Sequence, residues 1–311
     1  MNNYVVYHLH SDLSNAVTNI DSVTKYGEYI ARAKECGMAA LGFAEHGSIM
    51  EWWHKKCDIE AAGMKYIHGI EVYVTCTMEE KIRDNMHCVL MAKNLDGVME
   101  LNRLVSKSFT RTDNHFYYYP RISMDELFAT SENIIVTSAC IGGIIAKSEG
   151  DQLDKFLSFM SENRGRCFLE IGHHPAQKQV EHNQFLYLLS RQYRIPLIAG
   201  TDTHCLNDEH VRGRSILQKS KNICFDNEDD WDLRFKTFDE LVESYRQQGA
   251  LSEEVYMEAI DNTNRLADMI EPFTMDKGTK YPHIYDDPER TFREKIEKSV
   301  AKHPYLTQRY G

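Results

Sequence analysis

Seven short segments rich in β-branched and aromatic residues alternate with segments of helical periodicity along the first 200 residues. These predicted strands comprise residues 4–7, 39–43, 65–74, 87–92, 133–137, 167–171 and 196–200. Strands that alternate with helices indicate an α/β fold with a parallel sheet, either doubly wound or closed as a barrel. In both architectures the chemistry collects at the carboxyl ends of the strands. Polar residues at those ends are therefore the first candidates for a functional site.

Helical patterns fill the segments between the strands and dominate the chain after residue 204. The predicted helices include residues 19–37, 96–108, 123–128, 151–163, 177–193, 209–219, 237–247, 252–268 and 288–302. We expect an aromatic loop over residues 116–121, a solvated acidic loop over 226–232 and an extended connector over 273–287. The chain thus predicts an α/β body followed by a helical extension.

The bulk composition excludes several classes of protein. No apolar run reaches the length of a membrane span, and the N-terminus lacks the features of a secretory signal. The eight cysteines form no C-x-x-C pair, so we expect a protein of the reducing cytoplasm without a disulfide framework. The formal net charge of −11 argues against a broad basic surface for nucleic acid. It leaves room for a nucleic-acid enzyme whose bound cations supply local positive charge.

Two pairs of residues at strand ends have the spacing of metal ligands. His8 and His10 follow the first predicted strand, and side chains two residues apart on an extended backbone share a face. Two imidazoles that point to one spot suit a divalent metal. Asp202 and His204 repeat the arrangement after the last predicted strand. The alternative for Asp202 is a turn residue that caps the next helix, and we favour the metal pair.

Further candidates lie in or beside the other strands. They are Glu45, His46, Glu71, His87, Cys140, His173 and His174. A buried carboxylate such as Glu71 needs a cation or strong donors, which a salt bridge would also provide. His87 has the alternative of an ordinary core histidine, and Cys140 that of a small buried hydrophobe. His173 and His174 have no identified partner, and we treat them as structural.

Six motifs, taken together and in this order, resemble the PHP (polymerase and histidinol phosphatase) domain. They are H-L-H-S (8–11), A-E-H-G (44–47), G-I-E-V-Y (69–73), H-C-V-L-M-A-K-N (87–94), S-A-C-I-G-G (138–143) and T-D-T-H (201–204). Each motif is weak alone, but the set is specific. The likeness is strongest to the PHP domain that begins bacterial DNA polymerase III alpha subunits. It extends to L-N-R-L-V-S (101–106), Y-Y-Y-P-R-I (117–122) and the segment 258–268, and so covers essentially the whole chain.

The resemblance implies a distorted seven-stranded β/α barrel that holds two or three divalent metal ions. The ligands that it implies are His8, His10, His46, Glu71, His87, Cys140, Asp202 and His204. The catalytic residues that it implies are His10, His46, Asp202 and His204. Zinc, manganese and iron all tolerate this mixture of imidazole, thiol and carboxylate. The family also places an Asp shortly after the second His, where this chain has Asn15 or Val17. We therefore expect one metal position to lack a carboxylate.

The implied activity is that of a metal-dependent phosphoesterase, and in the polymerase family it is 3′–5′ exonuclease proofreading at a DNA 3′ end. Arg121 is a candidate phosphate contact. Residues 1–272 would form the PHP domain, and residues 273–311 a connector and helix leading toward an absent polymerase palm, so no polymerase activity is expected. Polymerase domains or replisome proteins are the implied partners. The alternatives are a small-molecule phosphatase similar to histidinol-phosphate phosphatase and a non-catalytic module that stabilises a polymerase.

Overall fold

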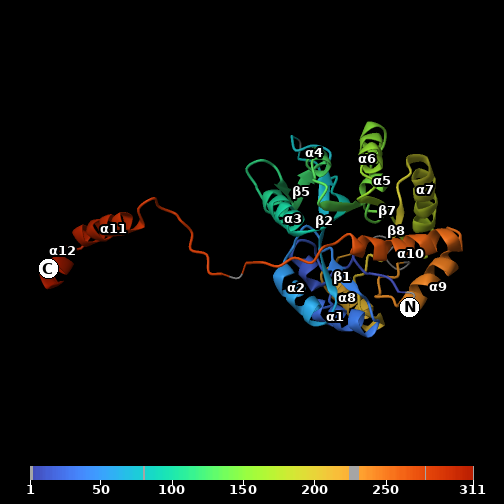
Figure 1. Ribbon diagram of the computed structural model, residues 1–311, viewed down its shortest axis with the longest axis horizontal. Coiled ribbons are helices and arrows are strands. Elements are labelled where there is room, and N and C mark those ends of the chain that lie inside the picture. Colours follow the sequence, from blue (N-terminus) through green and yellow to red (C-terminus); the bar gives the residue numbers. More distant parts are fainter. Residues whose placement is uncertain (1–2, 80, 224–230, 277, 311) are drawn as a thin grey trace. The chain divides into compact units, whose positions relative to one another are not determined.

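The computed structural model describes residues 3–79, 81–223, 231–276 and 278–310. Contacts divide the chain into two units, residues 1–273 and 274–311, whereas the sequence-based division placed the boundary one residue earlier. The first unit carries the sheet and most of the helices (Figure 1). The second unit contains α11 (Pro288–Lys302) and α12 (Pro304–Tyr310). Among the described residues, no helix combines the length and the apolar character needed to cross a membrane.

Strand pairings run in a circuit around the first unit. β1 (Ala40–Phe43), β2 (Lys65–Thr75), β3 (Met86–Ala92), β6 (Ile134–Thr137), β7 (Cys167–Gly172) and β8 (Leu197–Gly200) pair successively. The N-terminal segment completes the circuit through isolated bridges, with Val6 beside Leu41 of β1 and Leu9 beside Thr203 after β8. It takes the place of a strand without forming a regular one. The predicted distorted seven-stranded barrel is confirmed.

Within the circuit, β3 runs against the other strands, so the prediction of a parallel sheet is wrong for this strand. β3 is antiparallel to both of its neighbours, β2 and β6. The reason is local, because only residues 76–85 join β2 to β3 and the described part of this link contains no crossover helix, whereas parallel neighbours need such a crossover. The reversal brings the start of β3 to the end of the barrel where the parallel strands finish. His87 therefore reaches the same place as residues that follow the other strands.

Apolar side chains from every strand of the circuit fill the barrel. The central cluster is made of Val5, Tyr7, Ala40, Ala44, Ile67, Val89, Met91, Ile135, Ala139, Phe168, Ile198, Leu266, Ala267 and Ile270. The last three come from α10 (Glu253–Asp268) and the residues just after it, and α10 packs against β8. This apolar core packs beneath the polar groups that gather at one end of the barrel.

The remaining helices flank the sheet (Figure 1). They are α1 (Tyr26–Glu35), α2 (Trp52–Ala61), α3 (Leu95–Ser108), α4 (Met124–Phe128), α5 (Ile144–Lys147), α6 (Asp151–Glu162), α7 (Gln177–Tyr193), α8 (Asp208–Ser220) and α9 (Phe238–Gln248). A short 3-10 helix covers Asp12–Ala16. The seven cysteines in the described residues are all free.

Three local predictions need correction or comment. The first helix begins at Tyr26 rather than at residue 19, which leaves residues 17–25 as a loop. The aromatic segment 116–121 is not a loop, because β4 (Phe116–Tyr117) and β5 (Tyr119–Ser123) form a hairpin there, and β5 also pairs with the end of β2. Most of the acidic segment 226–232 lies outside the described residues.

Gly97 tests the packing of α3 on the sheet. A Cβ added there would lie 2.5 Å from the carbonyl oxygen of Asn133, so the backbone of one element would have to move. We expect Gly97→Ala to destabilise the protein by about 1–3 kcal/mol, as overpacking does. Gly27→Ala is the matched control, because nothing lies within 4 Å of its added Cβ and Ala is the better helix former. Urea unfolding of both variants measures the difference, and equal midpoints would contradict the packing described.

Candidate metal centre

Most of the residues that the sequence singled out in or beside the strands converge at one end of the barrel. His8 and His10 come from the N-terminal segment, and His46 follows β1. Glu71 lies in β2, His87 is the second residue of β3, and Cys140 follows β6. Asp202 and His204 follow β8. The structure thus brings together all eight predicted ligands, although six different strands or strand-like segments supply them.

Glu71 lies at the middle of this convergence. Its Oε1 is 2.9 Å from Nδ1 of His87 and 3.6 Å from Nε2 of His8. Its Oε2 is 2.9 Å from Nδ1 of His46 and 3.4 Å from Nε2 of His10. The side chain is 1% exposed, and neither oxygen has a hydrogen bond of acceptable geometry. One buried carboxylate is therefore surrounded by four imidazoles without being satisfied by any of them.

Asp202 contacts histidines from the N-terminal segment and from the segment that follows β8. Its Oδ1 lies 3.1 Å from Nε2 of His204, 3.2 Å from Nε2 of His8 and 3.3 Å from Nε2 of His10. The backbone of Asp202 has φ of 41°, in the left-handed region that Asp tolerates better than most residues. Such a conformation is held only when the surrounding structure determines it. The fold thus accepts local strain to aim this carboxylate at the cluster.

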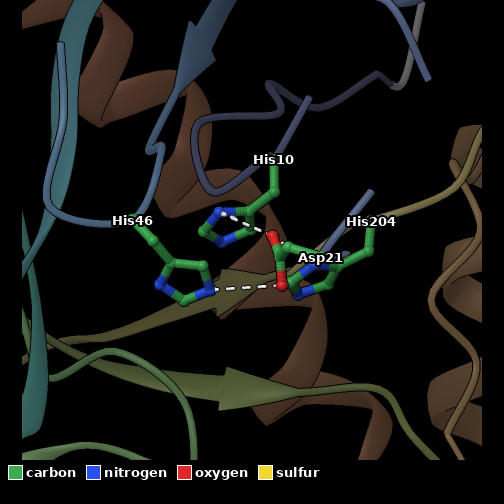
Figure 2. Close-up of side chains that lie close together, drawn as sticks. All are labelled: His10, Asp21, His46 and His204. Atoms are coloured by element: carbon green, nitrogen blue, oxygen red, sulfur yellow. Dashed lines mark hydrogen bonds and ion pairs between the residues drawn. The ribbon is translucent and has the colours of Figure 1, made fainter. Parts of the chain in front are cut away.

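Asp21 supplies a carboxylate that the sequence analysis missed. Figure 2 shows its carboxyl group among the imidazoles of His10, His46 and His204. Its Oδ2 lies 3.1 Å from Nδ1 of His204 and 3.9 Å from Nδ1 of His10, and its Oδ1 lies 3.5 Å from Nε2 of His46. Asp21 is therefore placed where it could supply the carboxylate that the sequence analysis expected to be missing.

Asn15 holds the loop that carries Asp21. The Asn15 Oδ1 accepts hydrogen bonds from the backbone N–H of Asp21 at 2.6 Å and of Ser22 at 3.2 Å. Its Nδ2 donates to the carbonyl of Ser22 at 2.7 Å. Asn15 is thus a turn residue rather than a substitute ligand. The β-branched Val23 and Thr24 were a signal for a later start of the first helix. A predicted start at Tyr26 would have placed Asp21 in a loop, where it could have been recognised as a candidate ligand.

Cys140 approaches the cluster from a tight turn beside His87. Its Sγ lies 3.8 Å from Nδ1 of His87 and accepts the N–H of Gly142 at 3.4 Å. A Cβ added at Gly142 would lie 3.0 Å from Nδ1 of His87, so glycine leaves room for this ring. Burial raises the pKa of the Cys140 thiol, and nearby carboxylates including Asp202 raise it further. The sulfur therefore needs a cation beside it to become a thiolate ligand.

The donor atoms fit divalent metal ions. Three overlapping groups place their ligand atoms within 4.8 Å of one another, and these groups are His10/Asp21/His46/His204, His8/His10/Glu71 and His46/Glu71/His87. Buried atoms without a hydrogen-bond partner include Nε2 of His8, Nε2 of His10, Nδ1 of His46 and both carboxylate oxygens of Glu71. Orphaned buried polar atoms are costly, and cations held by these overlapping groups would satisfy them. Nitrogen with oxygen donors suits zinc, manganese or iron.

The carboxylates of the cluster are held ionised. Burial alone would raise the pKa of Glu71, but the charges of His87 and the other nearby imidazoles hold that pKa well below its usual value. Neighbouring imidazoles likewise hold the pKa values of Asp21 and Asp202 well below the usual value against the effect of burial. Ionised oxygens are the form in which a carboxylate binds a metal.

The imidazoles divide between two protonation states. Burial, with His46 and His204 beside it, lowers the pKa of His10 to about 4, so this ring is neutral at pH 7. Burial opposes protonation of His204, but Asp21 and Asp202 outweigh it and raise the pKa to about 9. In the metal-free protein, protons on such rings thus supply the positive charge that a cation would otherwise bring.

Glu45 organises the loop behind the cluster. It accepts the N–H of Ser11 at 2.9 Å and the hydroxyls of Ser11 at 2.5 Å and Ser14 at 2.6 Å, and it pairs with the buried Lys55 at 2.5 Å. The Ser14 hydroxyl also lies 3.2 Å from Nδ1 of His10. Sequence reasoning named Glu45 but could not find Ser14 or Lys55, because nothing in the chain pairs them with it.

Arg121 does not face the cluster with a free guanidinium. Its side chain is fully buried, and its three nitrogens donate to the carbonyls of Ile82 at 2.8 Å, Asn114 at 2.7 Å and His115 at 3.4 Å. These bonds hold the β4–β5 hairpin to the loop after β2. This geometry does not support the predicted contact with a substrate phosphate, and we replace it by a structural role.

His173 and His174 belong to none of the three ligand groups within the described residues. They are buried after β7, with ring centroids 4.6 Å apart and His174 4.7 Å from the ring of Trp231.

The profile of the PHP domain family matches residues 7–174. The chain belongs to the PHP family. It is 30% identical over 285 residues to the DNA polymerase III subunit alpha of Borreliella burgdorferi, which covers 87% of this chain and 24% of that protein. It is 26% identical over 331 residues to the corresponding protein of Aquifex aeolicus, with 96% and 27% covered. The chain thus spans about a quarter of the length of these curated relatives.

Among solved structures, an amidohydrolase from Chromobacterium violaceum aligns with a TM-score of 0.43 and 15% identity, covering 67% of this chain and 89% of that one. The family match confirms the resemblance that the motifs indicated.

Asp21 and Asp12 give a matched test of the carboxylate assignment. We expect Asp21→Asn to weaken the binding of the adjoining metal by about tenfold or more, because a neutral amide replaces a charged oxygen ligand. Asp12→Asn should leave binding unchanged, since Asp12 pairs with Lys25 on the surface. Metal titration against a chromophoric chelator compares the two. Equal affinity in both variants would remove Asp21 from the centre.

Metal binding should also release protons. At pH 7 His204 holds a proton because its pKa is raised to about 9, and a bound cation must displace it. Protons compete less as the pH rises, so the apparent metal affinity should increase from pH 6 to about pH 9. Calorimetric titration in buffers of different ionisation enthalpy measures the released protons. A heat of binding independent of the buffer would contradict the protonated state described.

Proposed function

We propose that this chain is a metal-dependent phosphoesterase whose substrate is the 3′ end of a DNA strand. The observation that carries the proposal is the gathering of unsatisfied nitrogen atoms of His8, His10 and His46 around the buried carboxylate of Glu71, in overlapping groups of ligand atoms. Such a cluster is chemically suited to bound cations, and membership of the PHP family gives it a phosphoesterase context. The assignment of the individual ligands is part of this proposal.

Bound divalent ions supply two capacities to such a site, which are polarisation of a phosphate oxygen and generation of hydroxide from water at neutral pH. The chain's own residues provide the setting. Glu71, Asp21 and Asp202 would hold the cations as ionised oxygens, while His10 presents a neutral imidazole. His87 and Cys140 would complete the position beside β3. The left-handed turn at Asp202 and the Asn15 clamp on Asp21 fix two of the carboxylates before any substrate arrives.

A DNA 3′ end is favoured over a small phosphomonoester by the relatives. The curated relatives described above are DNA polymerase III alpha subunits, and the alignments continue past the family match into the helical region. We infer a 3′–5′ exonuclease that acts in proofreading, with polymerase domains or replisome proteins as partners. The small-molecule phosphatase and the non-catalytic module remain the outcomes that the experiment separates.

The experiment compares substrates and one ligand variant. After loading with manganese, zinc or iron, we expect a labelled single-stranded DNA to be shortened from its 3′ end far faster than histidinol phosphate is hydrolysed. Asp202→Asn should lower both the metal content and the DNA rate, the rate by about a hundredfold or more. Asn is chosen because it tolerates the φ of 41° at this position.

Asp151→Ala is the matched control, since Asp151 is exposed on α6 and pairs with Lys155. It should retain full metal content and activity. Faster hydrolysis of the phosphomonoester would favour a small-molecule phosphatase. No hydrolysis of either substrate with any of the three metals would favour the non-catalytic module.

A further inference from the structure

His8 has a close partner on the side of its ring that faces away from the cluster. Its Nδ1 lies 2.5 Å from Oε1 of Glu170, while its Nε2 faces Asp202 at 3.2 Å and Glu71 at 3.6 Å. The His8 and Glu170 side chains are 0% and 2% exposed. One imidazole thus joins a carboxylate of β7 to the focus of the metal centre.

Glu170 is placed behind the centre rather than in it. Its second oxygen, Oε2, accepts the hydroxyl of Thr137 at 2.6 Å, so both oxygens have partners. Within the described residues, Glu170 belongs to none of the three groups of convergent ligand atoms. A direct ligand would need a free oxygen toward the focus, and Glu170 instead uses one oxygen for His8 and the other for β6.

The fold reserves space for this carboxylate. A Cβ added at Gly200 of β8 would lie 2.0 Å from Oε1 of Glu170, so any larger residue there would displace the carboxyl group. The Glu170 N–H donates to the hydroxyl of Ser138 at 2.9 Å, which fixes the backbone on the other side. Gly200 of β8 and the hydroxyls of Thr137 and Ser138 at the end of β6 together define a single position for Glu170.

The backbone of His8 is fixed independently of its ring. Its carbonyl accepts hydrogen bonds from two residues after β8. These are the N–H of Thr203 at 3.3 Å and the hydroxyl of Thr201 at 3.3 Å. The bond between Nδ1 and Glu170 is then what sets the rotation and the tautomer of the imidazole. A hydrogen bond at one ring nitrogen decides which nitrogen is left to bind a metal.

We propose that Glu170 is a positioning residue that accepts a hydrogen bond from the Nδ1–H of His8 and so presents Nε2 of His8 as a metal donor. A carboxyl group hydrogen-bonded to the far nitrogen also makes the imidazole a more basic ligand. This inference depends on the metal binding in the proposed function but not on the substrate. The alternative is a buried ion pair that stabilises the barrel and has no effect on the metal.

Zinc binding by the full chain tests the proposal. Glu170→Gln keeps the size of the side chain and removes its charge, and we expect it to weaken Zn²⁺ affinity by about 10–100-fold. Competition with a chromophoric chelator measures the affinity, and circular dichroism verifies folding. Glu126→Gln is the matched control, because Glu126 also lies beside an imidazole, 3.0 Å from Nε2 of His115, but contacts no residue of the centre. It should bind Zn²⁺ as the unmodified protein does.

A spectroscopic measurement on the unmodified protein gives an independent result. In the ¹⁵N-histidine-labelled, Zn²⁺-loaded chain, we expect His8 to show a protonated Nδ1 and a metal-bound Nε2. Unchanged affinity in folded Glu170→Gln, or a His8 bound through Nδ1, would overturn the positioning role while leaving the proposed function intact. If Glu170→Gln does not fold, the His8 tautomer alone decides. Absence of Zn²⁺, Mn²⁺ and Fe²⁺ binding by the unmodified protein would overturn the proposed function itself.

Discussion

The charge of Glu71 is the constraint on which this end of the barrel depends. An ionised carboxylate taken out of water loses several kcal/mol of hydration unless charge and hydrogen bonds replace it. The contacts around Glu71 are imidazoles, at 2.9–3.6 Å, and none of them forms a hydrogen bond of good geometry with it. A permanent ammonium or guanidinium would satisfy the oxygens and close the site. Imidazoles, which can lose their protons, instead leave the carboxylate available to a cation.

The same constraint explains the supporting residues. Ligands that lie within a few ångströms of one another must be held in place by residues outside the cluster. Glu45 with Lys55 ties down the loop of His10 and His46 on one side. Glu170 with Thr137 does the same for His8 on the other. Each support pairs a buried carboxylate with donors that it fully uses, so neither competes with the ligands for the metal. Because the supporting groups have hydrogen-bond partners, the ligand atoms can lack them and stay available to a metal.

The sequence predicted ligands that lie in or beside the strand segments and missed Asp21, whose position depends on tertiary contacts. His8, His10 and Asp202 could be found because strand alternation and chain order place them at the barrel end. Asp21 could not, because its position comes from the bonds of Asn15 to the loop rather than from any period. The direction of β3 was missed because the strand pattern is the same in parallel and antiparallel pairs. Arg121 was misjudged because no sequence pattern shows which carbonyls surround a guanidinium.

Bound cations would reconcile the acidic chain with the anionic substrate proposed above. The chain carries a formal net charge of −11, so its distant field does not attract a nucleic acid. The carboxylates of Asp21, Glu71 and Asp202 add to that charge only while the centre holds no cation. Two or three divalent ions would bring about four to six positive charges to the same small volume and reverse its sign locally. Binding of a phosphate would then depend on the loaded centre at short range, while the net negative charge of the chain would disfavour long contacts along a nucleic-acid backbone. Such a centre would suit the proposed substrate, in which one phosphate at the end of a strand is bound rather than many along it.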